Sequence, residues 1–412
     1  MTKKDLADPL AAFRDYFYHP KDTIYLDGNS LGKLPLGTAE SLQEVVLKQW
    51  GQNLIASWNK DWLALPHELA KQMSHLLNGL PEEIIIGEST SVRLFQITQA
   101  LVNSQQFPKT LLTDQLNFPT DLYILDQIAM QSLGKKAVVI SYQSELEADL
   151  EQLKDSLGKT PGIYCLSLVT YKSGFLYPML ELNRLAKESG SIIIWDLSHA
   201  VGVVDIDLKA TETRVALGCT YKYLNGGPGA PAFLYVDKTL MSTLENPIAG
   251  WFSHAKPFDF SLEYEAHNTI NKMAVGTPPI LSLVALQKGL SICLAAGTKA
   301  LQEKSRIQTQ WLFEQIELRL IPYGVTLESP RDANQRGAHI SIAHLEAWRI
   351  TQALQAASPQ IIPDYRPDKY IRLGLAPLYT RYSDLQTTVD ILEDILKDKS
   401  YLNFSHQKAT VT

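Results

Sequence analysis

Apolar residues in the middle of the chain alternate between short β-branched runs and longer stretches with helical spacing. The short runs predict strands over 84–86, 110–113, 137–142, 162–168 and 191–195. The stretches between them predict helices over 90–103, 118–133, 145–157 and 178–189. Strands that alternate with helices favour a mostly parallel sheet with helices on both faces, so we expect an α/β fold.

Further segments extend this core on both sides. A run over 215–219 predicts a short strand, and 230–236 predicts another, which we expect to be antiparallel because it follows a turn rather than a helix. Before the alternation, 23–27 has the pattern of a brief strand. Helices are expected over 37–52 and 66–77, the second with proline at its first helical position.

The pattern changes after residue 276. One long helix is expected over 280–320, with Gly289 and Gly297 as weak interruptions. Strand-like runs at 325–327, 339–342 and 370–373 then mix with helices at 345–357 and 383–397, which predicts a smaller α+β domain. At 412 residues the chain exceeds one ordinary core. We expect a large α/β domain over 54–290 and a small domain over 291–412, with residues 1–53 packing on the small domain.

Composition narrows the class of protein. Hydrophobic residues make up 45% and charged residues 20%, as in a soluble globular protein. The net charge of −6, without a basic run, argues against nucleic acid or an anionic membrane as a partner. Three separated cysteines in apolar segments, no apolar leader and no membrane-spanning stretch predict a cytoplasmic protein with a reduced interior.

The strongest chemical signal is an acid and a lysine on this strand–turn background. Asp196 follows the apolar run 192–195, and ligands in open α/β sheets bind at the carboxyl ends of strands. Lys222 stands between Tyr221 and Tyr223, just after the run 215–219. Such a pair suits pyridoxal phosphate (PLP), with the lysine forming a Schiff base and the acid holding the pyridine nitrogen protonated. Taken singly, Asp196 could instead cap a helix and Lys222 could be an exposed loop lysine.

Two helix starts add candidate ligands. Residues 88–92 follow the predicted strand at 84–86 and open a helix, so backbone N–H groups and the hydroxyls of Thr90 and Ser91 could stabilise an anion. A capping role for Ser89 or Thr90 is the alternative. Phe118, also at a helix start, could stack on a flat ring or belong to the core.

Three other motifs do not support the chemistry that their residues first suggest. GNSLG at 28–32 fits the G-x-S-x-G pattern of serine hydrolases, but Pro35 prevents a helix from starting where a nucleophile elbow needs one. We expect a tight turn that presents polar groups to a site. The histidines lack acidic or thiol companions at metal-ligand spacing, so no metal is expected. Residues 226–229 are not followed by Lys-Ser or Lys-Thr and form no Walker loop.

Several stretches together resemble kynureninase, a PLP enzyme of fold type I. The similar stretches occur in family order over nearly the whole chain: LDGNSLG at 26–32, FPTD at 118–121, DLSHAVG at 196–202, YKYLN at 221–225, GWFSH at 250–254, GTPPIL at 276–281 and APLY at 376–379. The resemblance implies a large PLP-binding domain with a mostly parallel sheet and a smaller α+β domain at the carboxyl terminus.

The resemblance also implies roles for single residues. Lys222 matches the Schiff-base lysine, Asp196 the partner of the pyridine nitrogen, and Arg372 the group that holds the substrate carboxylate, with Asn29 also facing the substrate. The other cofactor-binding positions implied are Thr90, Ser91, Phe118, Thr120, Asp121, Ser167, His199 and Tyr221. Trp251 and Thr277 match residues that reach the phosphate from the neighbouring subunit, which implies a homodimer with shared active sites.

The implied reaction is hydrolysis of L-kynurenine, or of 3-hydroxy-L-kynurenine, to anthranilate or 3-hydroxyanthranilate and L-alanine. It would serve tryptophan catabolism through the kynurenine pathway, which leads to NAD biosynthesis. Tyr221 is our candidate proton donor at the substrate carbonyl. An aminotransferase or a cysteine desulfurase-like lyase on the same fold is the alternative enzyme, and a non-catalytic binding protein the alternative class. The chain departs from the family pattern at Arg93 and over 271–275.

Overall fold

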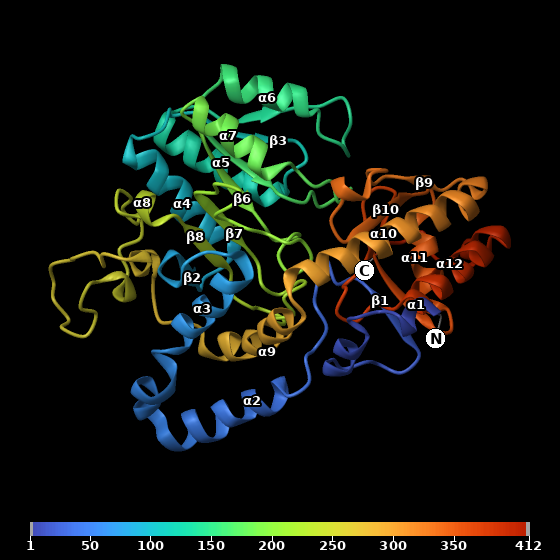
Figure 1. The fold of residues 1–412 in the computed structure, drawn as a ribbon, viewed down its shortest axis with the longest axis horizontal. Helices are drawn as coiled ribbons and strands as arrows, with labels where there is room; N and C mark the ends of the chain where they lie inside the picture. Colours follow the sequence, from blue (N-terminus) through green and yellow to red (C-terminus); the bar gives the residue numbers. More distant parts are fainter. Residues whose placement is uncertain (1–2, 409–412) are drawn as a thin grey trace.

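The fold has two sheets in separate parts of the molecule (Figure 1). The structure, a computed structural model, describes residues 3–408. The larger sheet has seven strands in the order β2-β8-β7-β6-β5-β3-β4. Its strands are β2 (Ile84–Ile86), β3 (Leu111–Asp114), β4 (Val138–Ile140), β5 (Ile163–Ser167), β6 (Ile192–Asp196), β7 (Val215–Gly218) and β8 (Phe233–Val236).

Five of the seven strands run parallel, as expected from the alternating pattern. β4, β3, β5, β6 and β7 pair in parallel, whereas β8 is antiparallel to both β7 and β2. The expected antiparallel orientation of β8 is thus confirmed. The segment that joins β7 to β8 contains Lys222. Because β7 is parallel to β6, this segment lies at the carboxyl ends of both strands.

Helices cover both faces of the large sheet, which explains why its strands are mostly apolar. Trp195 of β6 packs in a core cluster with α3, α6, α7 and α9, and its neighbour Ile194 packs in a second cluster with α4 and α5. These helices are α3 (Leu65–Leu77), α4 (Thr90–Ser104), α5 (Pro119–Leu133), α6 (Leu150–Lys159), α7 (Met179–Glu188) and α9 (Ile280–Ala296), with the short α8 (Lys238–Met241) nearby.

The smaller sheet combines the two ends of the chain. Its order is β1-β11-β12-β10-β9, with β1 parallel to β11 and the other pairs antiparallel. The strands are β1 (Thr23–Leu26), β9 (Thr326–Leu327), β10 (His339–Ala343), β11 (Gln360–Arg366) and β12 (Tyr370–Gly374). A separate core cluster joins them to α10 (Thr298–Arg319), α11 (Ala347–Ala356) and α12 (Tyr382–Lys397). β11 was not expected, because Pro363 and the charged residues around it break the strand pattern.

The prediction of a single helix over 280–320 is wrong, because two helices occupy this range. Gly297 ends α9 with φ 79° and ψ 136°, and α10 continues at an angle of 82°. This backbone conformation suits glycine alone, so the residue separates two helices rather than weakening one. The expected domain boundary at residue 290 falls inside α9. No single helix among residues 3–408 is long and apolar enough to cross a membrane, although the bent pair α9 and α10 together has the length and composition.

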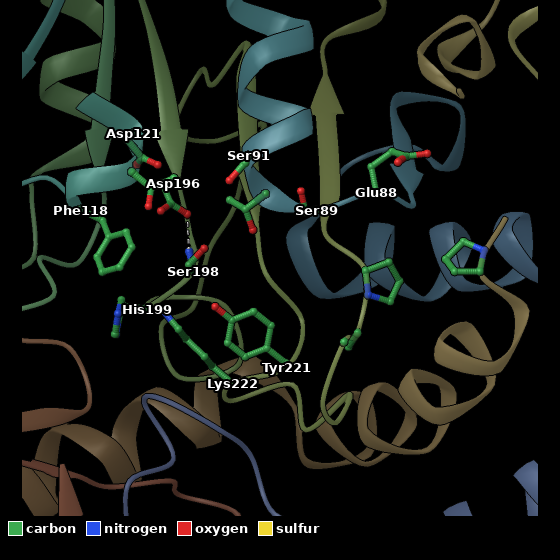
Figure 2. A pocket seen from close by; sticks show the side chains of 16 residues that line it. Glu88, Ser89, Ser91, Phe118, Asp121, Asp196, Ser198, His199, Tyr221 and Lys222 are labelled. Carbon is green, nitrogen blue, oxygen red and sulfur yellow. Dashed lines mark hydrogen bonds between the residues drawn. The ribbon is translucent and has the colours of Figure 1, made fainter. Parts of the chain in front are cut away.

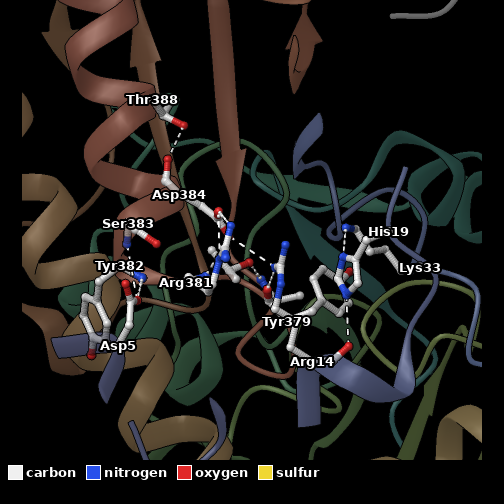
Figure 3. Close-up of polar contacts among 12 residues, drawn as sticks. Asp5, Arg14, His19, Lys33, Tyr379, Arg381, Tyr382, Ser383, Asp384 and Thr388 are labelled. Carbon is white, nitrogen blue, oxygen red and sulfur yellow. Dashed lines mark hydrogen bonds and ion pairs between the residues drawn. The ribbon is translucent and has the colours of Figure 1, made fainter. Parts of the chain in front are cut away.

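Buried polar contacts tie the N-terminal segment to the small domain (Figure 3). Oδ1 of Asp5, in α1 (Lys3–Leu6), accepts a hydrogen bond of 2.7 Å from the backbone N–H of Tyr382 at the start of α12. Arg14 lies 3.2 Å from Asp384 of α12. Later in the N-terminal segment, α2 (Thr38–Glu44) packs on α9 of the large domain. The segment therefore contacts both domains.

Several short helical turns complete the described chain. They are the 3₁₀ turns Ala11–Tyr16, Leu54–Ala56, Pro81–Glu83, Trp251–Ser253, Ile270–Met273, Ile321–Tyr323, Ala333–Gln335 and Ser400–Asn403, and the π-helical turns Val45–Asn53 and Trp58–Trp62. The helix expected over 37–52 therefore starts as α2 and continues as a π-helix. The three cysteines are free and buried.

Candidate active site

A cavity of about 540 Å³ opens where the end of β6 and the first turns of α4 and α5 converge (Figure 2). It lies at the carboxyl ends of the parallel strands, as expected for an open α/β sheet. Its lining residues are Glu88, Ser89, Thr90, Ser91, Phe118, Thr120, Asp121, Asp196, Ser198, His199, Tyr221, Lys222, Gly229, Ala230, Pro231 and Pro279.

Asp196 and Lys222 both line this cavity, although 25 residues of loop and strand separate them along the chain. Asp196 is the last residue of β6, and its Oδ1 accepts a hydrogen bond of 2.8 Å from the N–H of Ser198. No helix starts there, so Asp196 is not a helix cap. Nζ of Lys222 lies 2.9 Å from Nε2 of His199. The cavity therefore holds an amine, an imidazole and a carboxylate.

Burial sets the protonation of these groups. It raises the pKa of Asp196, while the hydrogen bonds from Ser198 and the charge of Lys222 oppose the rise. Burial and the nearby Asp196 carboxylate raise the pKa of Asp121 well above its usual value. Burial, followed by the charge of Lys222, lowers the pKa of His199 well below its usual value. His199 is therefore a neutral imidazole beside the lysine.

The first turn of α4 forms the wall opposite Lys222. Ser89 is the N-cap, and its Oγ accepts a hydrogen bond of 3.3 Å from the N–H of Val92. The capping alternative thus applies to Ser89, which lines the cavity together with Thr90 and Ser91 at the positive end of the helix. Free backbone N–H groups and hydroxyls at a helix N-terminus suit a phosphate.

Phe118 is not a core aromatic. Its side chain is 40% exposed, lines the cavity and contacts the edge of Tyr171. Asn117 fixes this position: its Oδ1 accepts hydrogen bonds from the N–H of Phe118 at 2.9 Å and from the hydroxyl of Ser167. Sequence inspection missed Asn117, although its place directly before the FPTD stretch is a signal. Ser167 pairs with Asp196 across β5 and β6 but does not line the cavity.

The GNSLG turn packs on the backbone of Lys222, which confirms the turn and not the hydrolase elbow. The N–H of Gly32 donates to the carbonyl of Tyr221 at 2.8 Å, and a Cβ at Gly32 would lie 2.2 Å from the carbonyl oxygen of Lys222. Only glycine allows this approach. The turn also buries Asn29, whose amide atoms have no hydrogen bond among residues 3–408.

Arg372 lies outside the lining of the cavity, in the buried centre of β12. Its Nε pairs with Asp364, its Nη1 donates to the carbonyl of Tyr171, and its Nη2 is 3.3 Å from Oγ of Ser30. The guanidinium is thus held between the small domain, the GNSLG turn and the loop after β5.

Trp251 and Thr277 do not reach this cavity. Both side chains are exposed, and neither lines the cavity that holds Lys222. Trp251 instead contacts the rings of Phe252, Phe258 and Phe260 within its own loop. In Figure 1 this loop, coloured yellow, projects away from the large sheet beyond α8.

Tyr221 lies beside Lys222, with its ring 5.8 Å from Nζ (Figure 2). Burial raises the pKa of its hydroxyl above the usual value, and Cys219 and Asp196 add to the rise. The hydroxyl therefore carries its proton at neutral pH and can donate it only to a strongly basic oxygen.

The residues of the cavity fit a pyridoxal phosphate. The cofactor needs an amine, a carboxylate for its ring nitrogen, a flat apolar contact and an anion site, and Lys222, Asp196, Phe118 and the start of α4 offer these around one space. Two buried polar atoms that line it, Oδ2 of Asp121 and Nδ1 of His199, have no hydrogen-bond partner among residues 3–408. No group of three or more potential metal ligands occurs in the same range.

Comparisons with known sequences find similarity to one protein family. Residues 301–392 match the family model described as Kynureninase C-terminal domain. The chain is 36% identical to the kynureninase of Pseudomonas fluorescens over 98% of this chain and 96% of that protein. It is 35% identical to the kynureninase of Burkholderia mallei (strain SAVP1) over 96% of this chain and 95% of that protein.

Solved structures share the fold at low sequence identity. A cysteine desulfurase from Thermococcus onnurineus NA1 aligns with a TM-score of 0.79 at 18% identity, covering 94% of this chain and 98% of that chain. A cysteine desulfurase from Escherichia coli aligns with a TM-score of 0.78 at 17% identity, with the same coverage. At such identities the likeness concerns the fold alone.

Proposed function

The chain belongs to the kynureninase family, and we propose that it hydrolyses L-kynurenine to anthranilate and L-alanine with PLP as cofactor. The observation that carries the proposal is the single cavity in which Lys222, Asp196 and the first turn of α4 meet. In this proposal the reaction is a step of tryptophan breakdown through kynurenine, a pathway that leads to NAD biosynthesis. The 3-hydroxy derivative is the second substrate to compare.

Each end of the cofactor has a proposed group. Lys222 would form the covalent link, Asp196 would hold the ring nitrogen and Phe118 would pack on the ring, with Thr120, Asp121, Ser167 and His199 nearby. Thr90, Ser91 and Tyr221 would hold the phosphate. PLP supplies an electron sink that stabilises negative charge at the substrate α-carbon.

Lys222 and Tyr221 divide the proton transfers in this proposal. Once its amine is released, Lys222 removes the proton from the α-carbon, and His199, 2.9 Å away, orients that amine. His199 is neutral, so it accepts a hydrogen bond from the amine without competing for positive charge. The protonated hydroxyl of Tyr221 donates to the substrate carbonyl oxygen as that oxygen gains charge.

Arg372 and Asn29 bind the substrate in this proposal. Two of the donors of Arg372 contact neutral acceptors, the carbonyl of Tyr171 and the hydroxyl of Ser30, which a substrate carboxylate can replace. Asp364 keeps the third donor and so holds the guanidinium plane. The amide of Asn29, which has no hydrogen-bond partner in the described part of the chain, gives the substrate another partner at the same turn.

We further propose a cytoplasmic homodimer with shared sites. The support is that Trp251 and Thr277 are exposed and lie outside the cavity of their own chain. The loop that carries Trp251 also exposes Phe258, Phe260 and Leu262, an apolar group that a partner subunit would cover.

The first test is Lys222→Ala on the full chain. We expect loss of anthranilate and alanine release from L-kynurenine, and loss of the visible absorbance band of the lysine-bound cofactor. Lys209→Ala, at an exposed lysine, is the control that should keep both. Kynurenine cleavage by the Lys222 variant would overturn the assignment.

The same assay separates the alternatives. An aminotransferase would consume a keto acid without forming anthranilate, and a desulfurase would form alanine from cysteine. The second is disfavoured because none of the three buried cysteines lines the cavity. Side-by-side rates with kynurenine and 3-hydroxykynurenine decide the preferred substrate.

A further inference from the structure

Arg93 is a buried cation that has no carboxylate partner within ion-pair distance among residues 3–408. It lies one turn into α4 and is 1% exposed. Its Nε donates to the carbonyl of Gly87 at 3.0 Å, and its Nη1 donates to Oε1 of Gln96 at 3.0 Å and to the carbonyl of Met273 at 2.6 Å. A buried guanidinium is costly unless neutral acceptors surround it, so these carbonyls must stay in place.

The carbonyl of Met273 belongs to the other segment that departs from the family pattern. The amide of Gln96 also donates to this carbonyl at 3.2 Å and to Oδ1 of Asn246 at 3.1 Å. The amide of Asn246 in turn donates to the carbonyls of Lys272 and Ala274, at 2.8 and 3.2 Å. Side chains of α4 therefore fasten the backbone over 272–274.

Val275 carries this attachment to the loop around Trp251. The N–H of Phe252 donates to the carbonyl of Val275 at 3.2 Å. A Cβ at Gly250 would lie 2.1 Å from the same carbonyl oxygen, so the two strands of chain touch there. Trp251 is flanked by these contacts, and Thr277 is two residues beyond Val275. Both residues are thus tied to α4, whose first turn lines the cavity of its own chain.

We propose that Arg93 is a positioning residue that fixes Trp251 and Thr277 to α4, so that each subunit presents them to the cofactor phosphate of its partner. This inference rests on the proposed homodimer and cofactor. The start of α4 lines the site of its own subunit. In this proposal, the same helix also supports Trp251 and Thr277, which complete the site of the partner subunit. The two departures from the family pattern, Arg93 and residues 271–275, act as one contact.

The first experiment measures PLP affinity of apo full-length variants by titrating the visible band of the lysine-bound cofactor. Arg93→Met should raise the PLP concentration at half-saturation about tenfold, because it removes three hydrogen bonds from a charged donor. Arg93→Lys, which keeps the positive charge but not the planar fork of donors, should recover part of the loss. Arg336→Met is the matched control, because Arg336 is also buried and also donates to backbone carbonyls, those of Pro330 and Arg331.

The control separates positioning from general stability. The midpoint temperature of thermal unfolding should fall for both arginine variants, whereas the affinity for PLP should fall only for Arg93→Met. Gly250→Ala, which keeps Arg93 but forces the loop away from Val275, should weaken PLP binding in the same way. Equal PLP affinities of the Arg93 and Arg336 variants would overturn the proposal.

The second experiment asks which subunit Arg93 serves. A heterodimer of one Arg93→Met subunit and one Lys222→Ala subunit, isolated through two affinity tags, has a single lysine-bound site. The neighbour of that site carries an intact Arg93. We expect the PLP concentration at half-saturation of this band to return to within about threefold of the wild-type value.

The outcomes remain distinct from those of the proposed function. A band that stays as weak as in the Arg93→Met homodimer, or a chain that forms no dimer, would overturn the assignment to the partner's site. A wild-type protein that binds PLP but releases no anthranilate would overturn the proposed reaction, while the titrations would still decide the role of Arg93.

Discussion

His339 shows how the fold places a residue that the sequence pattern does not single out. It lies at the start of β10, and its ring is 5.8 Å from that of His199, centroid to centroid. Both ring nitrogens are buried. Burial, with the charge of Arg372 as the next cause, lowers the pKa of His339 to about 3.

The pKa of His339 predicts a pH dependence of stability. As the pH falls below about 6.5, the unfolded chain takes up a proton at this histidine, whereas the folded chain stays neutral until about pH 3. Acid therefore favours the unfolded state over this window. Between about pH 7.5 and pH 5 the wild type should lose about 2 kcal/mol more unfolding free energy than His339→Asn.

Urea unfolding at several pH values checks this difference. His75→Asn, at an exposed histidine of α3, is the control for the substitution itself. Parallel pH curves for wild type and His339→Asn would show that the buried histidine does not contribute.

At the scale of elements, the break between α9 and α10 decides how the two domains meet. The apolar pattern continues through Gly297, so sequence periodicity alone extends the helix. The observed φ of 79° at this residue turns the chain by 82° and directs α10 into the small domain. Leu290 of α9 lies in the large core and Leu312 of α10 in the small one.

Two glycine substitutions should therefore have opposite effects. Gly297→Ala should cost about 1–3 kcal/mol of unfolding free energy, because alanine is strained at this φ and ψ, although no atom of residues 3–408 lies within 4 Å of the new Cβ. Gly158→Ala, at an exposed and open position inside α6, should stabilise by about 0.5–1 kcal/mol. Thermal and urea unfolding of the two variants give the signs, and stabilisation by Gly297→Ala would contradict the role of the bend.

At the scale of the molecule, the N-terminal segment holds the two ends of the chain together. β1 adds a parallel strand to the C-terminal sheet. Asp8 forms an ion pair of 2.6 Å with Lys304 of α10, and both side chains are about 95% buried, with exposures of 4% and 5%. Burial lowers the pKa of Lys304, and the contact with Asp8 opposes this shift. The lysine thus depends on its partner to remain charged.

A double-mutant cycle tests this link. Asp8→Asn should cost about 3 kcal/mol of unfolding free energy, because it removes the only carboxylate that forms an ion pair with this buried ammonium among residues 3–408. Adding Lys304→Met removes that charge and should recover at least about 1 kcal/mol. If the double variant is less stable than Asp8→Asn, the cost does not come from the unpaired lysine.

The sequence by itself determined the parts of this protein that depend on local order. Alternating apolar runs set the strands and helices of the large domain, because neighbours along the chain decide which face each residue turns to the core. Asp196, Lys222, Thr90 and Phe118 were recognisable since each follows a strand or opens a helix, and carboxyl ends of parallel strands meet at one edge.

Only the tertiary structure decided what depends on contacts between distant residues. The pairing of β1 with β11, the contact of Arg93 with the carbonyl of Met273 and the position of His339 beside His199 join residues that are 140 or more apart in sequence. No periodicity encodes such contacts, because they arise when separate elements pack. The tertiary structure likewise joined the two departures from the family pattern, which the sequence could only show as two isolated exceptions.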